Sequence, residues 1–210
     1  MIPQFPVYLF DVDGTLVDSA PDICGAVQEV LTGTRARAVD ELYLRRYIGY
    51  HLFDLFHDLI PDVTEEEKQT LLTNYRSTYT ARKHSATRLY PGVQEAIARI
   101  GGRKSTATTK STATVRSVLE MFDLLPHFDH VQGTDGFPAK PAPDVIFKSL
   151  EVFGVPPDQV LMIGDAATDM AAGRAAGVKI CAVSWGYGDH KAMATYEPDY
   201  WIDDLSALAG

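Results

Sequence analysis

Short apolar runs recur from about residue 90 to the C-terminus, separated by segments of helical periodicity. The run Val160–Ile163 is apolar throughout, which is typical of a strand buried on both faces. Val7–Phe10 is a similar run near the N-terminus, and it ends on Asp11. Strands that alternate with helices predict a parallel sheet covered by helices on both faces. The pattern predicts further strands at 104–108, 129–132, 180–183 and 200–202, and helices at 93–100, 113–122, 144–153 and 168–176.

A block of different character follows the first predicted strand. From about Ser19 to Ser85, apolar residues recur three or four positions apart, as in amphipathic helices, and no segment favours a strand. Thr64 precedes three glutamates at 65–67, a pattern typical of a capped helix start. The sequence therefore predicts an α/β fold with an inserted all-helical domain. We expect the core to comprise residues 1–17 and 88–210, and the helical domain residues 18–87.

The charge balance excludes some classes of partner. The 210 residues carry a formal net charge of −9. An acidic surface repels nucleic acid phosphates and anionic membranes, so we expect neither as a partner. A small anionic ligand remains compatible with this charge if a metal ion and a few lysines meet it locally.

Targeting signals and cysteines point to a reducing compartment. Residues 1–4 lack a basic region followed by a long apolar run, so we expect no signal peptide. No stretch approaches the ~20 apolar residues of a membrane span. Cys24 and Cys181 lie far apart in apolar segments, and we interpret them as buried hydrophobes rather than a disulfide framework. A cytoplasmic location is therefore expected.

Four aspartates follow the apolar strands. Asp11 and Asp13 come directly after the first strand, and Asp165 and Asp169 follow the strand 160–163. The carboxyl ends of parallel strands meet at one edge of a sheet, so these acids should converge. Four carboxylates that close repel one another unless a cation binds them. Magnesium, which prefers oxygen ligands and accompanies phosphates, is the expected cation. For Asp169, a helix-capping role is the alternative.

Two further polar residues lie between these acidic motifs. Thr108 ends a predicted strand, where its hydroxyl is suited to donate a hydrogen bond to a phosphoryl oxygen. Lys140 is followed by Pro141 and supplies a positive charge from a stiff segment. A lone threonine or lysine is ordinarily a surface residue. Their placement between the acidic motifs makes them candidates for phosphate binding.

Together these motifs resemble the four motifs of the haloacid dehalogenase superfamily, in the order that the family uses. The resemblance spans nearly the whole chain and implies a Rossmann-like three-layer core with an inserted helical cap. It rests on Asp11-x-Asp13-Gly14-Thr15, Thr108, Lys140 and Gly164-Asp165-x-x-x-Asp169.

The resemblance implies a role for each motif residue. Asp11 would attack phosphorus and form an aspartyl-phosphate. Asp13 would protonate the leaving oxygen and then activate water. Thr108 and Lys140 would hold the phosphoryl oxygens. Magnesium would be bound by the Asp11 and Asp165 carboxylates and the Asp13 backbone carbonyl, with Asp169 acting through water or by orienting Lys140.

The second acid also separates two reactions of the superfamily. Haloalkanoic acid dehalogenases need neither magnesium nor an acid at the position of Asp13, so its presence favours phosphoryl transfer. A helical cap that closes over the site excludes bulk water. The expected substrate is therefore a small phosphorylated metabolite rather than a phosphoprotein.

Within the superfamily, the chain is most similar to the phosphoglycolate phosphatase branch. The similar segments are Phe10–Ser19, Tyr90–Val93, Val183–Gly188 and Arg45–Gly49. Two residues depart from the branch pattern: Thr109 replaces the usual Asn of the second motif, and His51 replaces a Gly. Thr109 remains a candidate for substrate binding. Arg45 or Arg46 is a candidate clamp for a substrate carboxylate, with a solvated helix face as the alternative.

Other readings of the same motifs stay open. Phosphatases of pyrophosphate, nucleotides or sugar phosphates carry close variants of these segments. A β-phosphoglucomutase-like phosphomutase keeps every core motif and differs by protecting the aspartyl-phosphate from water. A catalytically retired member that binds a ligand or partner is the alternative outside enzymes, although such proteins often lose the nucleophile or a metal ligand. The oligomeric state is not readable from these patterns.

Overall fold

A five-stranded parallel sheet forms the centre of the molecule. The computed structural model describes residues 2–209; Met1 and Gly210, the outermost residues of the expected core segments, lie outside this range. The strand order is β4-β1-β5-β6-β7, and every neighbouring pair is parallel. The predicted α/β fold is therefore confirmed. The strands are β1 (Val7–Phe10), β4 (Arg103–Thr106), β5 (Val160–Gly164), β6 (Lys179–Val183) and β7 (Tyr200–Ile202).

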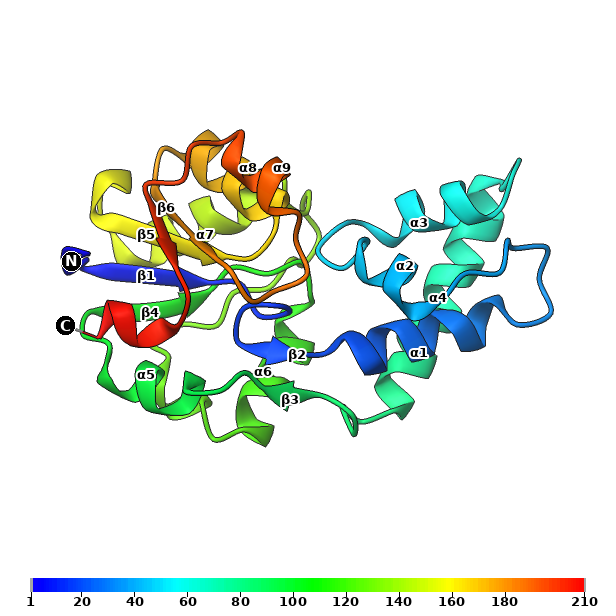
Figure 1. Ribbon diagram of the computed structural model, residues 1–210, viewed down its shortest axis with the longest axis horizontal. Coiled ribbons are helices and arrows are strands. Elements are labelled where there is room, and N and C mark those ends of the chain that lie inside the picture. The colour runs from blue at the N-terminus through cyan, green and yellow to red at the C-terminus, as the bar shows by residue number, and fades with distance from the viewer. Residues whose placement is uncertain (1, 210) are drawn as a thin grey trace.

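Both faces of the sheet are covered by helices, as the apolar runs predict. In β1, Val7 and Leu9 pack into the core on one face, while Tyr8 and Phe10 pack into the core on the other. This alternation follows from the two-residue period of a strand. Figure 1 shows α7, α8 and α9 on one face, and α5 and α6 on the other. These helices are α5 (Val93–Arg99), α6 (Thr112–Met121), α7 (Asp144–Phe153), α8 (Ala167–Ala176) and α9 (His190–Ala194); short 3₁₀ turns are η1 (Leu125–His127), η2 (Pro157–Gln159) and η3 (Leu205–Leu208).

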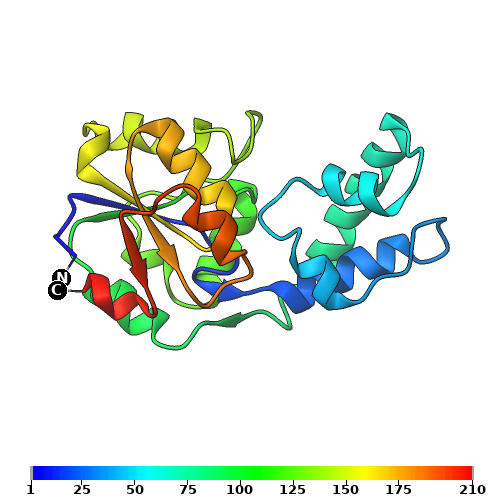
Figure 2. The ribbon, with the colours of Figure 1, turned by 45° about the horizontal axis from the view of Figure 1, so that its top comes forward.

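The helical region between β1 and β4 stands beyond the carboxyl edge of the sheet. Figures 1 and 2 place it at the opposite end of the molecule from both chain termini. It has its own core, in which Phe56 and Leu59 are fully buried. Thr64 caps the longest helix with a reciprocal hydrogen-bond pair to Glu67, so the predicted helix start is confirmed. The helices are α1 (Ala20–Leu31), α2 (Glu41–Arg45), α3 (Leu52–Leu59) and α4 (Glu65–Ala81).

Two chain segments connect the helical region to the core. They pair as a short antiparallel ribbon of β2 (Val17–Asp18) and β3 (Arg88–Leu89). The buried Asp22 carboxylate also links the two connecting segments, because it accepts hydrogen bonds from Arg82 Nε at 3.3 Å and Thr87 Oγ1 at 2.8 Å. A buried carboxylate needs such donors. The entry and exit of the helical region are thereby tied together.

The predicted strand at 129–132 is wrong. Within residues 2–209 this segment runs beside the edge strand β4 without forming a regular ladder. The Lys104 carbonyl accepts from the backbone N–H groups of residues 129 and 130. At Gln132, however, the backbone bonds the side-chain hydroxyl of Thr106 instead of the backbone of β4. This hydroxyl donates to the Gln132 carbonyl and accepts from the Gln132 N–H, both at 2.9 Å. These bonds explain why β4 is polar although buried.

Two smaller expectations concern the cysteines and the helices. Cys24 and Cys181 are both buried and unpaired, as predicted. Burial raises the pKa of each thiol to about 12. No helix within residues 2–209 combines the length and the apolar character that crossing a membrane would require.

Candidate active site

The first acidic motif forms a tight turn at the carboxyl end of β1. The Asp11 N–H still bonds the Ile163 carbonyl at 2.8 Å, so the ladder with β5 reaches the first acid. Gly14 then has φ +82°, and a Cβ there would lie 2.2 Å from Asp165 Oδ2. Only glycine combines this conformation with so close an approach. The Gly14 position therefore allows the first motif to pack directly against the fourth.

The fourth motif places two acids around the start of α8. Asp165 directly follows β5 and is buried; its carboxylate accepts from the Tyr187 N–H at 2.8 Å and from Thr15 Oγ1 at 3.1 Å. Asp169 lies in the first turn of α8 and accepts from the Ala166 N–H at 2.9 Å. The helix-capping alternative for Asp169 is thus realised, and its other carboxylate oxygen remains available for a second contact.

Lys140 supplies that second contact. Its Nζ lies 2.8 Å from Asp11 Oδ1, also pairs with Asp169 Oδ1, and donates to the Ala107 carbonyl at 2.8 Å. All three protons of the ammonium are therefore used. Burial lowers the pKa of Lys140, but the two carboxylates outweigh it and raise the pKa above its ordinary value. The first and fourth motifs therefore meet at this cation.

Three of the four predicted acids form a cluster that suits a divalent cation. Oxygens of Asp11, Asp165 and Asp169 all lie within 4.8 Å of one another, and all three residues are buried. Burial is the largest cause that raises the pKa of Asp11 to about 7, and it also raises the pKa of Asp165 well above its usual range. Clustered buried carboxylates gain most from a positive ion, and oxygen ligands are those that magnesium prefers.

The Asp13 side chain faces away from this cluster. Its Oδ1 accepts a hydrogen bond from Ser19 Oγ, and its Oδ2 lies 3.1 Å from Lys110 Nζ. The metal role expected for Asp13 therefore rests on its backbone carbonyl and not on its carboxylate. The carboxylate instead lies at the floor of a cavity, which fits an acid/base role toward a bound molecule.

Lys110 is a buried residue of the site that our sequence analysis did not single out. Besides the Asp13 ion pair, its Nζ donates to the Tyr79 hydroxyl of α4 at 2.8 Å. Burial lowers the pKa of Lys110, while Asp13 and Tyr79 raise it, and the net shift is upward. Its position two residues after Thr108, at the carboxyl edge of a parallel strand, was the available signal.

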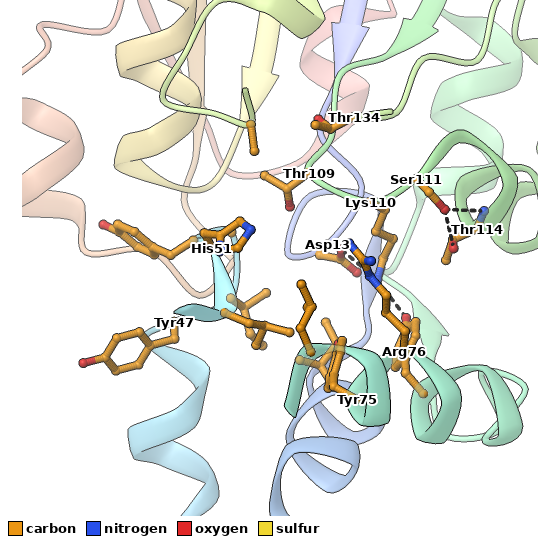
Figure 3. A pocket seen from close by; sticks show the side chains of 18 of the residues that line it. Asp13, Tyr47, His51, Tyr75, Arg76, Thr109, Lys110, Ser111, Thr114 and Thr134 are labelled. Carbon is orange, nitrogen blue, oxygen red and sulfur yellow. Dashed lines mark hydrogen bonds and ion pairs between the residues drawn. The ribbon is translucent and has the colours of Figure 1, made fainter. Parts of the chain in front are cut away.

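A cavity of about 680 Å³ lies between the helical region and the core (Figure 3). Asp13, Thr109 and Lys110 line its core side, so the predicted Thr109 does face this space. Aromatic and aliphatic residues together make up most of the opposite wall. That wall is lined by Ile23, Tyr47, Ile48, Gly49, Tyr50, His51, Leu52, Leu72, Tyr75, Arg76, Tyr79 and Thr80.

The two arginines predicted to bind a substrate carboxylate lie elsewhere. Within the described chain, neither Arg45 nor Arg46 lines the cavity. The Arg45 guanidinium donates two hydrogen bonds to Glu41 Oε1, and that of Arg46 lies 4.1 Å from the centre of the Tyr43 ring. Arg76 of α4 lines the cavity instead and is labelled in Figure 3.

Thr108 and His51 occupy supporting positions. Thr108 is fully buried at the end of β4; its Oγ1 accepts from the Lys110 N–H at 3.4 Å, and its carbonyl accepts from Thr134 Oγ1 at 2.9 Å. His51 caps α3 by accepting from the Phe53 N–H at 3.2 Å, and its ring lines the cavity. The departure from glycine at residue 51 therefore adds both a helix cap and a side chain in the cavity wall.

Comparisons with known proteins agree with this geometry. The family model for haloacid dehalogenase-like hydrolases matches residues 8–183. A phosphoglycolate phosphatase from Mesorhizobium japonicum is 33% identical over 97% of this chain and 92% of its own length. One from Aquifex aeolicus is 32% identical over 96% and 94%. A haloacid dehalogenase-like family hydrolase from Streptococcus pneumoniae superposes with a TM-score of 0.88 at 26% identity, covering 97% and 96% of the two chains.

Proposed function

The chain belongs to the haloacid dehalogenase-like hydrolase family, and from that premise we propose that it hydrolyses small phosphomonoesters through a magnesium-dependent aspartyl-phosphate mechanism. The observation that carries this proposal is the buried cluster of Asp11, Asp165, Asp169 and Lys140 at the carboxyl edge of the sheet. Buried charges are costly, and a purely structural role would not require four of them grouped at one edge of the sheet.

The donor set fits magnesium. The carboxylates of Asp11 and Asp165 and the Asp13 backbone carbonyl would hold the ion, with Asp169 beside them. When bound, the ion neutralises charge between the nucleophile and the phosphate. The close approach of Gly14 to Asp165 keeps this edge compact enough for one small cation. The raised pKa values of Asp11 and Asp165 fit the same assignment, because a cation among these acids favours their ionised forms.

The residues of this chain divide the chemistry between them. The Asp11 carboxylate oxygen attacks phosphorus, the bond from phosphorus to the leaving oxygen breaks, and Asp13 donates a proton to that oxygen. A water molecule then gives its proton to Asp13 and attacks phosphorus, which releases phosphate and restores Asp11. Thr108 and Lys140 bind the phosphoryl oxygens. Lys140 exchanges its contact with Asp11 for one with the phosphate, while Asp169 keeps the ammonium group in place.

We assign the helical region, residues 18–87, the role of a cap over this site. The two-stranded ribbon and the Asp22 contacts mark the place where it joins the core. The cavity between the two parts is large enough for a small metabolite, and α4 and the segment 47–52 cover it. A cap in this position excludes water from the aspartyl-phosphate and disfavours folded phosphoproteins as substrates.

Within this class, 2-phosphoglycolate is the proposed substrate. Full-length relatives named phosphoglycolate phosphatase support it, at 32–33% identity. A substrate with a carboxylate needs a cation besides those that hold the phosphate. In the described chain, Lys110 is matched by Asp13, whereas no carboxylate pairs with Arg76, which lines the same cavity. Arg76 is therefore the proposed partner of the substrate carboxylate, in place of Arg45 or Arg46.

The test is phosphate release with and without magnesium. The panel contains 2-phosphoglycolate, pyrophosphate, nucleoside monophosphates and sugar phosphates. We expect magnesium-dependent turnover that is fastest with 2-phosphoglycolate, and a loss of at least about a thousandfold in Asp11→Asn, because the nucleophile is removed. Exposed Asp158→Asn serves as the matched control.

Other outcomes of this panel would point elsewhere. Faster turnover of another panel member would redirect the substrate assignment while keeping the mechanism. Conversion of one sugar phosphate into another without phosphate release would indicate a mutase. Folded, magnesium-binding protein without activity on any member would overturn the proposed function and favour a binding protein.

A further inference from the structure

We propose that Lys110 is a positioning residue for Asp13, and that the Tyr79 hydroxyl of the helical region holds Lys110 in place. This inference rests on the proposed function, because it concerns the acid/base of the same reaction. Its starting point is a chain of two polar contacts among three side chains, which runs from α4 of the helical region into the core and ends on the acid/base carboxyl group. The chain crosses the cavity wall that faces the substrate.

The contacts of Lys110 leave its ammonium little freedom. Its Nζ lies 3.1 Å from Asp13 Oδ2 and 2.8 Å from the Tyr79 hydroxyl oxygen. The Lys110 side chain is 9% exposed and that of Asp13 is 8% exposed. An ammonium group that is removed from water needs acceptors for its protons, so these contacts are costly to break. The direction of Lys110 therefore fixes the direction of Asp13 Oδ2.

Tyr79 is itself held from two sides. Its ring stacks on Tyr75 of the same helix, with ring centres 5.6 Å apart, and the edge of the His84 ring meets it at 5.2 Å. These contacts fix the ring, and the ring fixes the hydroxyl within reach of Lys110. The helical region thus contributes to the placement of a core residue through one hydroxyl.

The arrangement also determines which oxygen of Asp13 exchanges the proton. An ammonium group has no acceptor, so a proton on Oδ2 would face the protons of Lys110. Oδ1 is contacted by Ser19 Oγ, and a hydroxyl both donates and accepts. In the proposed reaction, Oδ1 would therefore carry the exchanged proton. This proton would pass from Oδ1 to the leaving oxygen as that oxygen separates from phosphorus, and a proton from water would return to Oδ1 when the aspartyl-phosphate is hydrolysed.

The experiment is a double-mutant cycle on phosphatase activity. Tyr79→Phe keeps the ring and removes the hydroxyl, so we expect kcat to fall roughly fivefold with KM unchanged, as for the loss of one hydrogen bond. Lys110→Met should lower kcat on the order of a hundredfold, as for a misdirected general acid. The double variant should be no slower than Lys110→Met alone, because Tyr79 acts through Lys110.

A second readout separates acid placement from general damage to the fold. p-Nitrophenyl phosphate has a leaving group that is stable as an anion and needs little protonation. Tyr79→Phe should therefore lower kcat/KM less for this ester than for an alkyl phosphate such as 2-phosphoglycolate. Tyr43→Phe, which removes a hydroxyl that pairs with Asp58 in the helical region and does not line the cavity, is the matched control and should match the wild type on both esters.

Each negative result would reject a different part of the proposal. An inactive wild-type protein would reject the proposed function itself. An active wild type with an unaffected Tyr79→Phe variant would reject the role of the Tyr79 hydroxyl. Additive losses in the double variant, or equal losses on the two esters, would show that Lys110 does not place Asp13. Tyr79→Phe carries the test even if Lys110→Met fails to fold.

Discussion

The two sides of the cavity are built on different principles. On the core side, Asp13 and Lys110 pair directly in the cavity wall. Asp11, Asp169 and Lys140 form a second cluster of buried charges at the carboxyl edge of the sheet. On the side of the helical region, the wall is largely aromatic and apolar, with Arg76 as an exposed cation. The core side has the geometry and charge for a chemical step that is common to many substrates. The opposite side has the shape and surface for selecting among them.

This difference predicts which property a substitution on each side of the cavity will change. A change on the core side alters buried electrostatics, where effects are large because water does not screen them. A change on the wall of the helical region alters contacts with the variable part of a substrate. Lys110 and Tyr79 join the two sides, since one side chain comes from each.

The largest expected effect on stability comes from the core cation. Lys140→Met would leave the Asp11 and Asp169 carboxylates buried without their counter-ion. We expect the free energy of unfolding to fall by about 3–5 kcal/mol in metal-free buffer, as for other broken buried ion pairs. Urea denaturation measures this. Lys148→Met, at a half-exposed lysine paired with Glu151, is the control and should change stability by less than about 1 kcal/mol.

The loss of stability caused by Lys140→Met should increase with pH. The pKa of Asp11 in the folded protein is raised to about 7 from an ordinary value of 3.8, chiefly by burial. Between these values the folded state binds more protons than the unfolded state, so stability falls as pH rises through this window. Removal of Lys140 raises this pKa further, so its destabilising effect should be larger at pH 8 than at pH 5. An equal loss at both values would contradict this account.

An intermediate effect is expected at the wall of the helical region. Arg76→Ala should raise KM for 2-phosphoglycolate about tenfold, because a charge-assisted contact with the carboxylate is lost. Ethyl phosphate has the same length without the carboxylate, and its KM should not change. Arg45→Ala and Arg46→Ala are the matched controls. Equal increases in KM for both esters, or a larger effect in either control, would remove Arg76 from this role.

The smallest expected effect lies in the helical region away from the cavity. Thr64→Ala removes the hydroxyl that accepts from the Glu67 N–H at the start of α4. We expect a loss of about 1 kcal/mol in the free energy of unfolding and no change in kcat. Thr73→Ala, whose hydroxyl bonds the Gln69 carbonyl within the same helix, should have little effect. Thermal denaturation compares the two, and equal shifts would argue against the capping contribution.

Local sequence patterns predicted the elements that depend on local periodicity. The apolar runs located β1 and β5, and the capping pattern located the start of α4. The exception is the segment 129–132. Its apolar and polar positions favour a strand, but the Thr106 side chain occupies the hydrogen-bonding position that a ladder would need. A side chain that competes with backbone partners leaves no mark in a hydropathy pattern.

The sequence by itself determined the site residues that sit where strands end. Asp11 and Asp165 were identifiable because each directly follows an apolar strand, and the carboxyl ends of parallel strands meet at one edge of the sheet. Lys140 follows no strand, and its place between the acidic motifs made it a candidate. Asp169 was equally identifiable, although the sequence left its capping and catalytic roles as alternatives. The structure places both contacts on the one carboxylate.

The tertiary structure alone decided which side chains of the helical region face the core. Arg45 and Arg76 are both arginines on helices, and their sequence contexts do not distinguish a solvated arginine from one that lines a cavity. The packing of α4 against α1 brings Tyr79 within hydrogen-bonding distance of Lys110 and places Arg76 in the wall of the same cavity. Such contacts join residues about thirty positions apart in the chain, and they depend on how whole elements pack rather than on any local pattern.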